Sequence, residues 1–504
     1  MNSYALEFPL IQTPSSSSQT GTQPWTVRHA VEGTQIFGGI GSGKTSGSGR
    51  MIAIRFLNAG FGGLVLTVKS EEKEMWEEYC AITNRTDDLI VIEPGGNHRF
   101  NFLEYESQNA DGSEALTENI VDVLKTVIRA SEAADQGKSD DSFWETALDM
   151  LIFNVIDLCK MANGRVTLQE LYDIVLSLPK VKDTASLKDM DKTKAFFKAF
   201  TKAHSKAIDA INDREAYLTR VHGSATHIML TEEEMLELPE ARLFKFLDLF
   251  FLETFKNLSE KTRSIIEFTF SGFLFRLLRE PVFSLFCKGT STITPEDSIK
   301  GKIILVNLPV KKFNKVGRDC QILFKYIWQR AMEKRKVAEN SRPVFLWSDE
   351  AQNFLHEHDA NYQATARSSK IATVYISQNL PNYHARMGGA KSEYLVQGFL
   401  GTLGTKIFHA NADIETNKYA SELIGETMMD KESVSTSSTN GTVTSSHTVN
   451  REFERTIKPE EFARLNTGGE RNNYKVQGIL HRQGDAVNGN RSFVKMIFDQ
   501  KIKS

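Results

Sequence analysis

The sequence predicts an α/β fold, with a mainly parallel sheet and an all-α domain inserted into the chain. Two observations lead to this prediction. Short β-forming apolar runs alternate with helical patterns near both ends of the chain, which is the order typical of a doubly wound sheet. Between them, from about residue 113 to 279, strand patterns are almost absent and long helical patterns replace them.

The first part of the chain begins with residues 1–24, which are rich in Ser, Thr, Gln and Pro and predict a flexible or extended lead-in. A strand is expected at residues 34–37, followed by a glycine-rich loop and a helix from about residue 44 to 57. Two further strands are expected at residues 64–68 and 89–92.

Beyond residue 24, three parts of the chain are expected. The α/β domain comprises residues 25–145 and 280–504, and the inserted all-α domain comprises residues 146–279. A polar Ser/Thr-rich stretch at 433–450 predicts a flexible loop, hairpin or tether. After the insertion, strands are expected at residues 302–307, 344–347, 371–376 and 405–408.

Composition narrows the class of protein. A length of 504 residues suggests roughly three domains, or one large domain with an insertion. A net charge of −3 excludes a globally basic nucleic-acid binder, although a local basic surface stays open. The four cysteines are far apart, which indicates neither disulfides nor zinc and favours a reducing cytoplasm. No stretch approaches the ~20 apolar residues that span a bilayer, and no signal peptide is recognisable.

The glycine-rich loop has the pattern Gly-x4-Gly-Lys-Thr, which is specific for phosphate binding when it follows a strand and opens a helix. Lys44 is expected to reach the β- and γ-phosphates, and the Thr45 hydroxyl to bind Mg²⁺. A glycine turn that binds nothing is the alternative, and the flanking strand and helix disfavour it. ATP and Mg²⁺ are therefore the expected ligands. The residues expected to bind them are Gly38, Gly39, Ile40, Gly41, Ser42, Gly43, Lys44, Thr45 and Ser46.

Acidic and amide side chains follow two of the later strands. Asp349 and Glu350 end the apolar strand 344–347, and we expect Asp349 to hold Mg²⁺ and Glu350 to orient or deprotonate water. Gln378 follows strand 371–376 and is the candidate sensor of the γ-phosphate. Ligands of such sheets lie at the carboxyl ends of the strands, so these residues should converge on the glycine loop. Alternatively, the two acids merely cap a helix.

Arg367 precedes the strand at 371–376. In ring ATPases an arginine from a neighbouring subunit stabilises charge in the transition state, and Arg367 is our candidate for that role. A surface arginine on a helix is an equally good interpretation.

Taken in order, these motifs resemble the type IV coupling proteins of bacterial conjugation and type IV secretion. The resemblance extends from about residue 25 to 498. Besides the glycine loop and the Asp349–Glu350 pair, it rests on residues 66–71 (LTVKSE), 100–103 (FNFL), 142–144 (SFW), 258–264 (LSEKTRS), 366–367 (AR), 377–378 (SQ), 404–407 (GTKI) and 457–462 (IKPEEF). Two departures are a threonine at Thr67, where the family usually has aspartate, and the lack of the family's N-terminal membrane-spanning helices.

The resemblance implies a RecA-like P-loop NTPase domain that assembles into a homo-hexamer with ATP at the interfaces. It implies a cytoplasmic protein peripheral to the bacterial inner membrane, which acts with channel components and a possible separate membrane-anchoring subunit. Its substrate would be DNA, a relaxase–DNA complex or a secreted protein. Two interpretations are left open: a translocase that delivers DNA, and a coupling ATPase for protein effectors. A related RecA-like DNA-pumping motor is a further alternative, which the helical insertion disfavours. A scaffold that binds nucleotide without hydrolysis is disfavoured by Lys44, Asp349 and Glu350.

Overall fold

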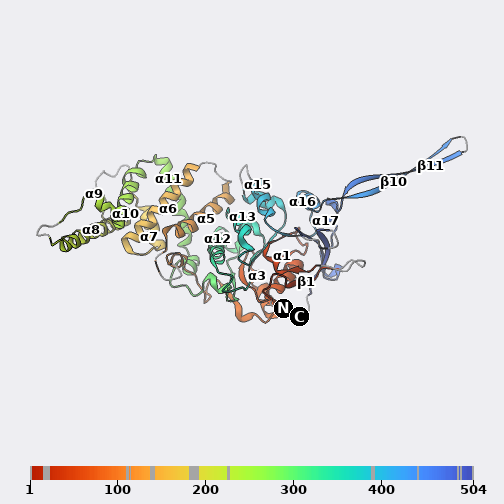
Figure 1. Cartoon of the computed structure of the whole chain (residues 1–504), viewed down its shortest axis with the longest axis horizontal. Helices are drawn as coiled ribbons and strands as arrows, with labels where there is room; N and C mark the ends of the chain where they lie inside the picture. The colour runs from red at the N-terminus through yellow and green to blue at the C-terminus, as the bar shows by residue number, and fades with distance from the viewer. Residues whose placement is uncertain are drawn as a thin grey trace. The chain divides into compact units, whose positions relative to one another are not determined.

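The chain forms two compact units in the computed structural model. We call them the sheet unit, which comprises Met1–Val91, Pro295–Lys312 and Trp328–Ser504, and the helical unit, which comprises Ile92–Thr294 and Phe313–Ile327 (Figure 1). The residues that the structure describes are 3–14, 23–108, 113, 115–136, 142–180, 192–223, 228–387, 392–439, 442–484, 487 and 491–501.

A nine-stranded sheet contains every strand predicted from the sequence, with shifts of no more than two residues at the ends. The strand order is β13-β12-β9-β3-β8-β7-β4-β6-β5. β3 pairs in parallel with β8 and β9, and β4 pairs in parallel with β6 and β7, so the predicted α/β fold with a mainly parallel sheet is confirmed. The bounds are β3 Thr34–Phe37, β4 Gly62–Leu66, β5 Leu89–Ile92, β6 Ile303–Val306, β7 Val344–Ser348, β8 Ile371–Ser377, β9 Thr405–Phe408, β12 Lys475–Arg482 and β13 Phe493–Asp499.

Two strands that were not predicted from the sequence, β12 and β13, extend the sheet beyond β9. β12 runs antiparallel to both β9 and β13. The burial of β13 alternates between buried and exposed residues, as expected of an antiparallel strand with one face on the core. Val476 and Phe498 from these strands belong to the main core and lie beside the glycine loop.

Helices cover the sheet. A single π-helical turn, Thr45–Gly49, leads from the glycine loop into α2. The helices of the sheet unit are α1 Val27–Val31, α2 Arg50–Asn58, α3 Glu71–Ile82, α13 Asp359–Ala366, α14 Leu380–Met387, α15 Ser392–Gly401, α16 Ile414–Ile424 and α17 Pro459–Phe462. α12, Val310–Lys334, contributes residues to both units.

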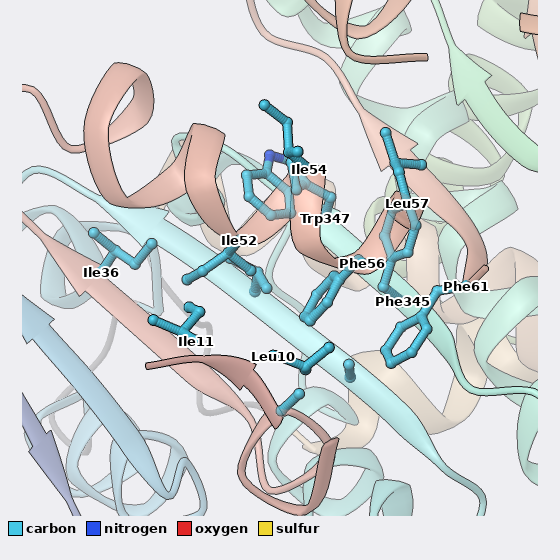
Figure 2. Close-up of a cluster of buried hydrophobic side chains, with 14 of the residues drawn as sticks. Leu10, Ile11, Ile36, Ile52, Ile54, Phe56, Leu57, Phe61, Phe345 and Trp347 are labelled. Atoms are coloured by element: carbon cyan, nitrogen blue, oxygen red, sulfur yellow. The ribbon is translucent and has the colours of Figure 1, made fainter. Parts of the chain in front are cut away.

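The core beneath α2 holds the glycine loop in place. Ile52 and Phe56 of α2 are fully buried, and Figure 2 shows them among Phe345 and Trp347 of β7. Burying an aromatic or branched side chain of this kind contributes about 1.5–3 kcal/mol. The start of α2 is therefore fixed relative to the strand that precedes Asp349 and Glu350.

The segment expected as a lead-in contains a strand. β1, Pro9–Ile11, pairs antiparallel with β2, Trp25–Thr26. Leu10 and Ile11 are buried in the main core, where their apolar side chains override the polar composition of the segment (Figure 2). Residues 15–22 lie outside the described part of the chain.

The helical unit consists of packed helices, and it includes α4, α5 and part of α12 in addition to residues 146–279. Phe196 and Phe200 of α8 pack against Phe251 and Phe244, at centroid distances of 5.1 and 5.0 Å. None of the described helices is long and apolar enough to cross a membrane. The helices are α4 Phe102–Glu106, α5 Thr117–Gln136, α6 Ser142–Asn163, α7 Leu168–Leu176, α8 Ala195–Val221, α9 Glu232–Glu237, α10 Pro239–Asp248 and α11 Glu260–Leu277.

The Ser/Thr-rich stretch 433–450 lies within a long antiparallel hairpin. β10, Glu426–Thr439, pairs with β11, Thr442–Arg455, in continuous register (Figure 1). Thr and Val favour strands, which accounts for pairing in a segment of low complexity. Residues 440–441 lie outside the described part of the chain.

Candidate nucleotide site

The glycine loop connects β3 to the helical turn at Thr45. Gly38 N donates to the Ser377 carbonyl at 3.3 Å, and Gly39 N donates to the Ala410 carbonyl at 2.8 Å. These bonds fix the loop between the carboxyl ends of β8 and β9. The loop thus lies where ligands of a parallel sheet bind.

Two glycines of the loop have conformations that other residues rarely adopt. Gly41 has φ +73° and Gly43 has φ +83°. A Cβ atom on Gly43 would also lie 2.5 Å from the Val476 side chain. Glycine permits this tight course, which turns backbone N–H groups inward as a phosphate cradle requires.

Ser42 provides a further sign of a cradle. Its hydroxyl oxygen is buried and has no hydrogen-bond partner among the described residues. A buried hydroxyl without a partner is costly, and a phosphate oxygen would satisfy it. Ile40, at the tip of the loop, has a side chain that is 89% exposed, so only its backbone can serve the site.

Thr45 and Asp349 meet across the site. The Thr45 hydroxyl donates to Asp349 Oδ2 at 2.8 Å, although the two residues are 304 positions apart. Burial raises the pKa of Asp349, and the bond from Thr45 opposes that shift. A hydroxyl and a carboxylate beside a phosphate cradle are oxygen ligands of the kind that Mg²⁺ prefers. These residues therefore fit a Mg²⁺ ion held jointly with phosphate.

Glu350 lies at the centre of the remaining side chains. Its Oε1 is 3.8 Å from Lys44 Nζ and accepts a hydrogen bond from Gln378 Nε2 at 3.1 Å. Its Oε2 accepts one from Gln352 Nε2 at 2.8 Å. Glu350 is also a left-handed residue, with φ +48°. A non-glycine residue in this region costs about 1–3 kcal/mol, which the neighbouring contacts must offset.

Two residues of the site, Gln352 and Glu72, were not predicted from the sequence. Gln352 bridges Glu350 to the Ser377 hydroxyl, which donates to Gln352 Oε1 at 3.0 Å. Its position two residues after Glu350 was the available signal. Glu72 is buried, and its Oε2 accepts from Val68 N at 2.7 Å. Burial and the charge of Asp349 raise the pKa of Glu72 to about 8.

His409 supports the glycine loop from the side opposite to the acids. Its Nε2 is 2.7 Å from the Ser48 hydroxyl, which in turn lies 3.1 Å from the Lys44 carbonyl. Its Nδ1 is 2.8 Å from the Gln477 carbonyl, so the neutral ring donates from Nδ1. Burial lowers the pKa of His409 to about 4, which keeps the ring neutral at physiological pH.

Arg367 is separate from the other predicted site residues. It follows α13 at the amino end of β8, whereas Gln378 follows the carboxyl end. The seven residues of β8 separate the two ends by roughly 20 Å. The Arg367 side chain is 58% exposed and lies 3.4 Å from Glu32. Arg367 therefore cannot serve the phosphate cradle of its own chain.

The fold is that of a RecA-like P-loop NTPase with a helical unit, and the glycine loop lies at the edge of the sheet where this fold places its phosphate cradle. Comparisons with known proteins then show what the chain is similar to. Residues 343–467 match the family model described as the TraM recognition site of TraD and TraG. Over these residues the match agrees with the resemblance to the type IV coupling proteins found in the sequence. No curated protein sequence matches the chain.

Solved structures of a coupling protein share the fold. The bacterial conjugative coupling protein TrwBdeltaN70 in its unbound monoclinic form matches with a TM-score of 0.59 and 13% identity, over 97% of this chain and 90% of that one. TrwB in complex with a non-hydrolysable ATP analogue matches with a TM-score of 0.58 and 13% identity, over 97% and 91%. TrwB in complex with ADP and Mg²⁺ matches with a TM-score of 0.58 and 12% identity, over 98% and 91%.

Proposed function

We propose that this chain is an ATP-hydrolysing coupling protein that recruits DNA, or a relaxase–DNA complex, and drives it into a type IV secretion or conjugation channel. The observation that carries the proposal is the convergence of Lys44, Thr45, Asp349, Glu350 and Gln378 at one edge of the sheet. The TraD/TraG match and the fold shared with TrwB support the proposed coupling role.

Each residue has a distinct task in hydrolysis. Lys44 neutralises charge on the β- and γ-phosphates, and backbone N–H groups of residues 38–46 bind the phosphate oxygens. Thr45 and Asp349 would hold Mg²⁺, which would neutralise negative charge on the phosphates. Glu350 accepts a proton from the attacking water or orients it.

Gln352 and Gln378 position Glu350. Both amides donate to its carboxylate, which fixes its orientation towards Lys44. Gln378 can exchange its hydrogen bond to Glu350 for one to the γ-phosphate. The position of its side chain, at the end of β8, would then depend on whether the γ-phosphate is present. Arg367, which is too distant to act in its own chain, completes the site of a neighbour in a homo-hexamer.

Steady-state ATP hydrolysis tests this proposal. The purified chain is assayed with single-stranded DNA, with double-stranded DNA and without DNA, over a range of protein concentrations. Turnover that DNA stimulates, and that rises more steeply than linearly with protein, is expected of a ring-forming DNA translocase. Lys44→Ala should abolish it, which shows that the activity belongs to this chain.

Other outcomes favour other functions. Hydrolysis that DNA leaves unchanged, together with binding to a secreted protein, would favour a coupling ATPase for protein effectors. Nucleotide binding without hydrolysis under any of these conditions would contradict the proposed enzyme.

A further inference from the structure

A small cluster of side chains contacts the C-terminal end of the glycine loop, at Ser46. We call it the Tyr474 cluster: Tyr474, which precedes β12, and Gln500 and Lys501, which follow β13. The catalytic acids follow β7, whereas β12 and β13 lie on the opposite side of β3 in the sheet. The cluster and the acids therefore lie on opposite sides of the glycine loop.

Gln500 links this cluster to the loop directly. Its Nε2 donates to the Ser46 hydroxyl at 2.6 Å, across 454 positions, and its Oε1 accepts from Gly469 N at 2.7 Å. The backbone N of Gln500 donates to the Tyr474 carbonyl at 2.9 Å. Lys501 lies with its Nζ 3.4 Å from the centre of the Tyr474 ring. Lys501, which contacts the Tyr474 ring, is therefore the neighbour in sequence of Gln500, which contacts the glycine loop.

The backbone at Tyr474 is unusual for an aromatic residue. Its φ is +58°, and Asn473 before it has φ +51°. Glycine or asparagine normally occupies such positions, because a bulky side chain there costs about 1–3 kcal/mol. Tyr474 is also only half-buried, so its ring is not explained by the core. A strained, accessible aromatic ring beside a ligand cradle indicates a role in binding.

The part of the nucleotide that the Tyr474 ring would contact depends on how ATP is oriented along the glycine loop. Lys44, Thr45 and Glu350 define the γ-phosphate end of the cradle. Backbone N–H groups of the loop bind the α- and β-phosphates, so the nucleoside extends from the end of the cradle away from these three side chains. Ser46 follows Thr45, and it is the residue that Gln500 contacts.

We propose that the Tyr474 cluster is the nucleoside subsite of this nucleotide site, which rests on the function proposed above. The base stacks on the Tyr474 ring, Gln500 offers its amide to the ribose hydroxyls, and Lys501 steadies the ring from its face. Stacking of a base on an aromatic side chain is tolerant of base identity and contributes a large share of affinity. The glycine loop binds the phosphates of ATP, and the Tyr474 cluster binds its nucleoside.

Calorimetric titration with two ligands tests this subsite. One ligand is Mg·ATP, and the other is Mg·tripolyphosphate, which carries the phosphates without a nucleoside. Tyr474→Ala and Tyr474→Gly should each weaken ATP about tenfold, in the range found for base stacking. Both should leave the affinity for tripolyphosphate within twofold of the wild type, and Tyr474→Phe should leave both affinities unchanged.

The glycine variant separates binding from folding. Tyr474→Gly relieves a left-handed backbone, so its melting temperature should equal or exceed that of the wild type while ATP affinity falls. Asn473→Gly is the matched control, because it relieves the same kind of strain next door and should alter neither affinity.

Any one of several results would overturn the proposal. Equal weakening of ATP and tripolyphosphate in the Tyr474 variants would show a general effect on the loop. Unchanged ATP affinity in Tyr474→Gly would show that the ring does not touch the nucleoside. A wild-type chain that binds tripolyphosphate and ATP equally well would reject the subsite alone, whereas one that binds neither would also reject the proposed ATPase.

Discussion

Glu350→Gln replaces the central carboxylate of the site by an amide of nearly the same size. The carboxylate accepts from Gln352 at 2.8 Å and from Gln378 at 3.1 Å, and it lies 3.8 Å from Lys44. The amide can accept at only one atom, so one of the two glutamine contacts is lost. It also cannot take a proton from water.

The expected loss of activity follows from that chemistry. A positioned general base contributes about 10²–10⁴-fold to a rate, which is about 3–5 kcal/mol of the barrier. ATP hydrolysis should therefore fall at least a hundredfold. Nucleotide affinity should stay within a few-fold or rise, because Lys44 remains and a negative charge beside the triphosphate is removed.

A coupled assay for phosphate release measures turnover, and titration with a fluorescent ATP analogue measures affinity. The matched control is Glu339→Gln, an exposed glutamate paired with Lys336 at 3.2 Å, which should leave both quantities unchanged. Turnover within fivefold of the wild type in Glu350→Gln, with binding intact, would refute its assignment as the base.

Three further predictions address other parts of the site. Thr45→Val removes the hydroxyl that lies 2.8 Å from Asp349, so hydrolysis should require at least tenfold more Mg²⁺, and an unchanged Mg²⁺ titration would contradict the ion site. Arg367→Ala should lower hydrolysis about a thousandfold if the residue acts in a neighbouring subunit, and mixing it with an inactive variant of the acid site should restore part of the activity; a mixture that stays inactive would rule out action in trans. Burial lowers the pKa of His409 from 6.5 to about 4, so the folded chain binds fewer protons than the unfolded chain between these values. Stability from this group is therefore complete above pH 6.5, and about 3 kcal/mol of it is lost as the pH falls to 4. In urea titrations His409→Gln should lose stability less steeply with acid than the wild type, the exposed control His447→Gln should behave as the wild type, and equal slopes in all three would contradict the buried neutral ring.

The sequence by itself predicted which residues meet at the glycine loop. The glycine loop, the strand before it and the helix after it are contiguous, so their pattern is local and readable. Asp349, Glu350 and Gln378 could be assigned because parallel strands bring their carboxyl ends to one edge. The predicted strands β3, β7 and β8 are indeed neighbours in the sheet.

Only the tertiary structure decided which other residues meet that site. Gln500 reaches Ser46 across 454 positions, and Val476 packs against Gly43 from a strand that was not predicted from the sequence. Arg367 precedes the same strand that Gln378 follows, and the length of β8 places them at opposite edges. Such contacts depend on strand order and register, and these are set by burial of the whole core and not by any local pattern. For that reason the sequence indicated the chemistry of the site, and the fold decided what surrounds it.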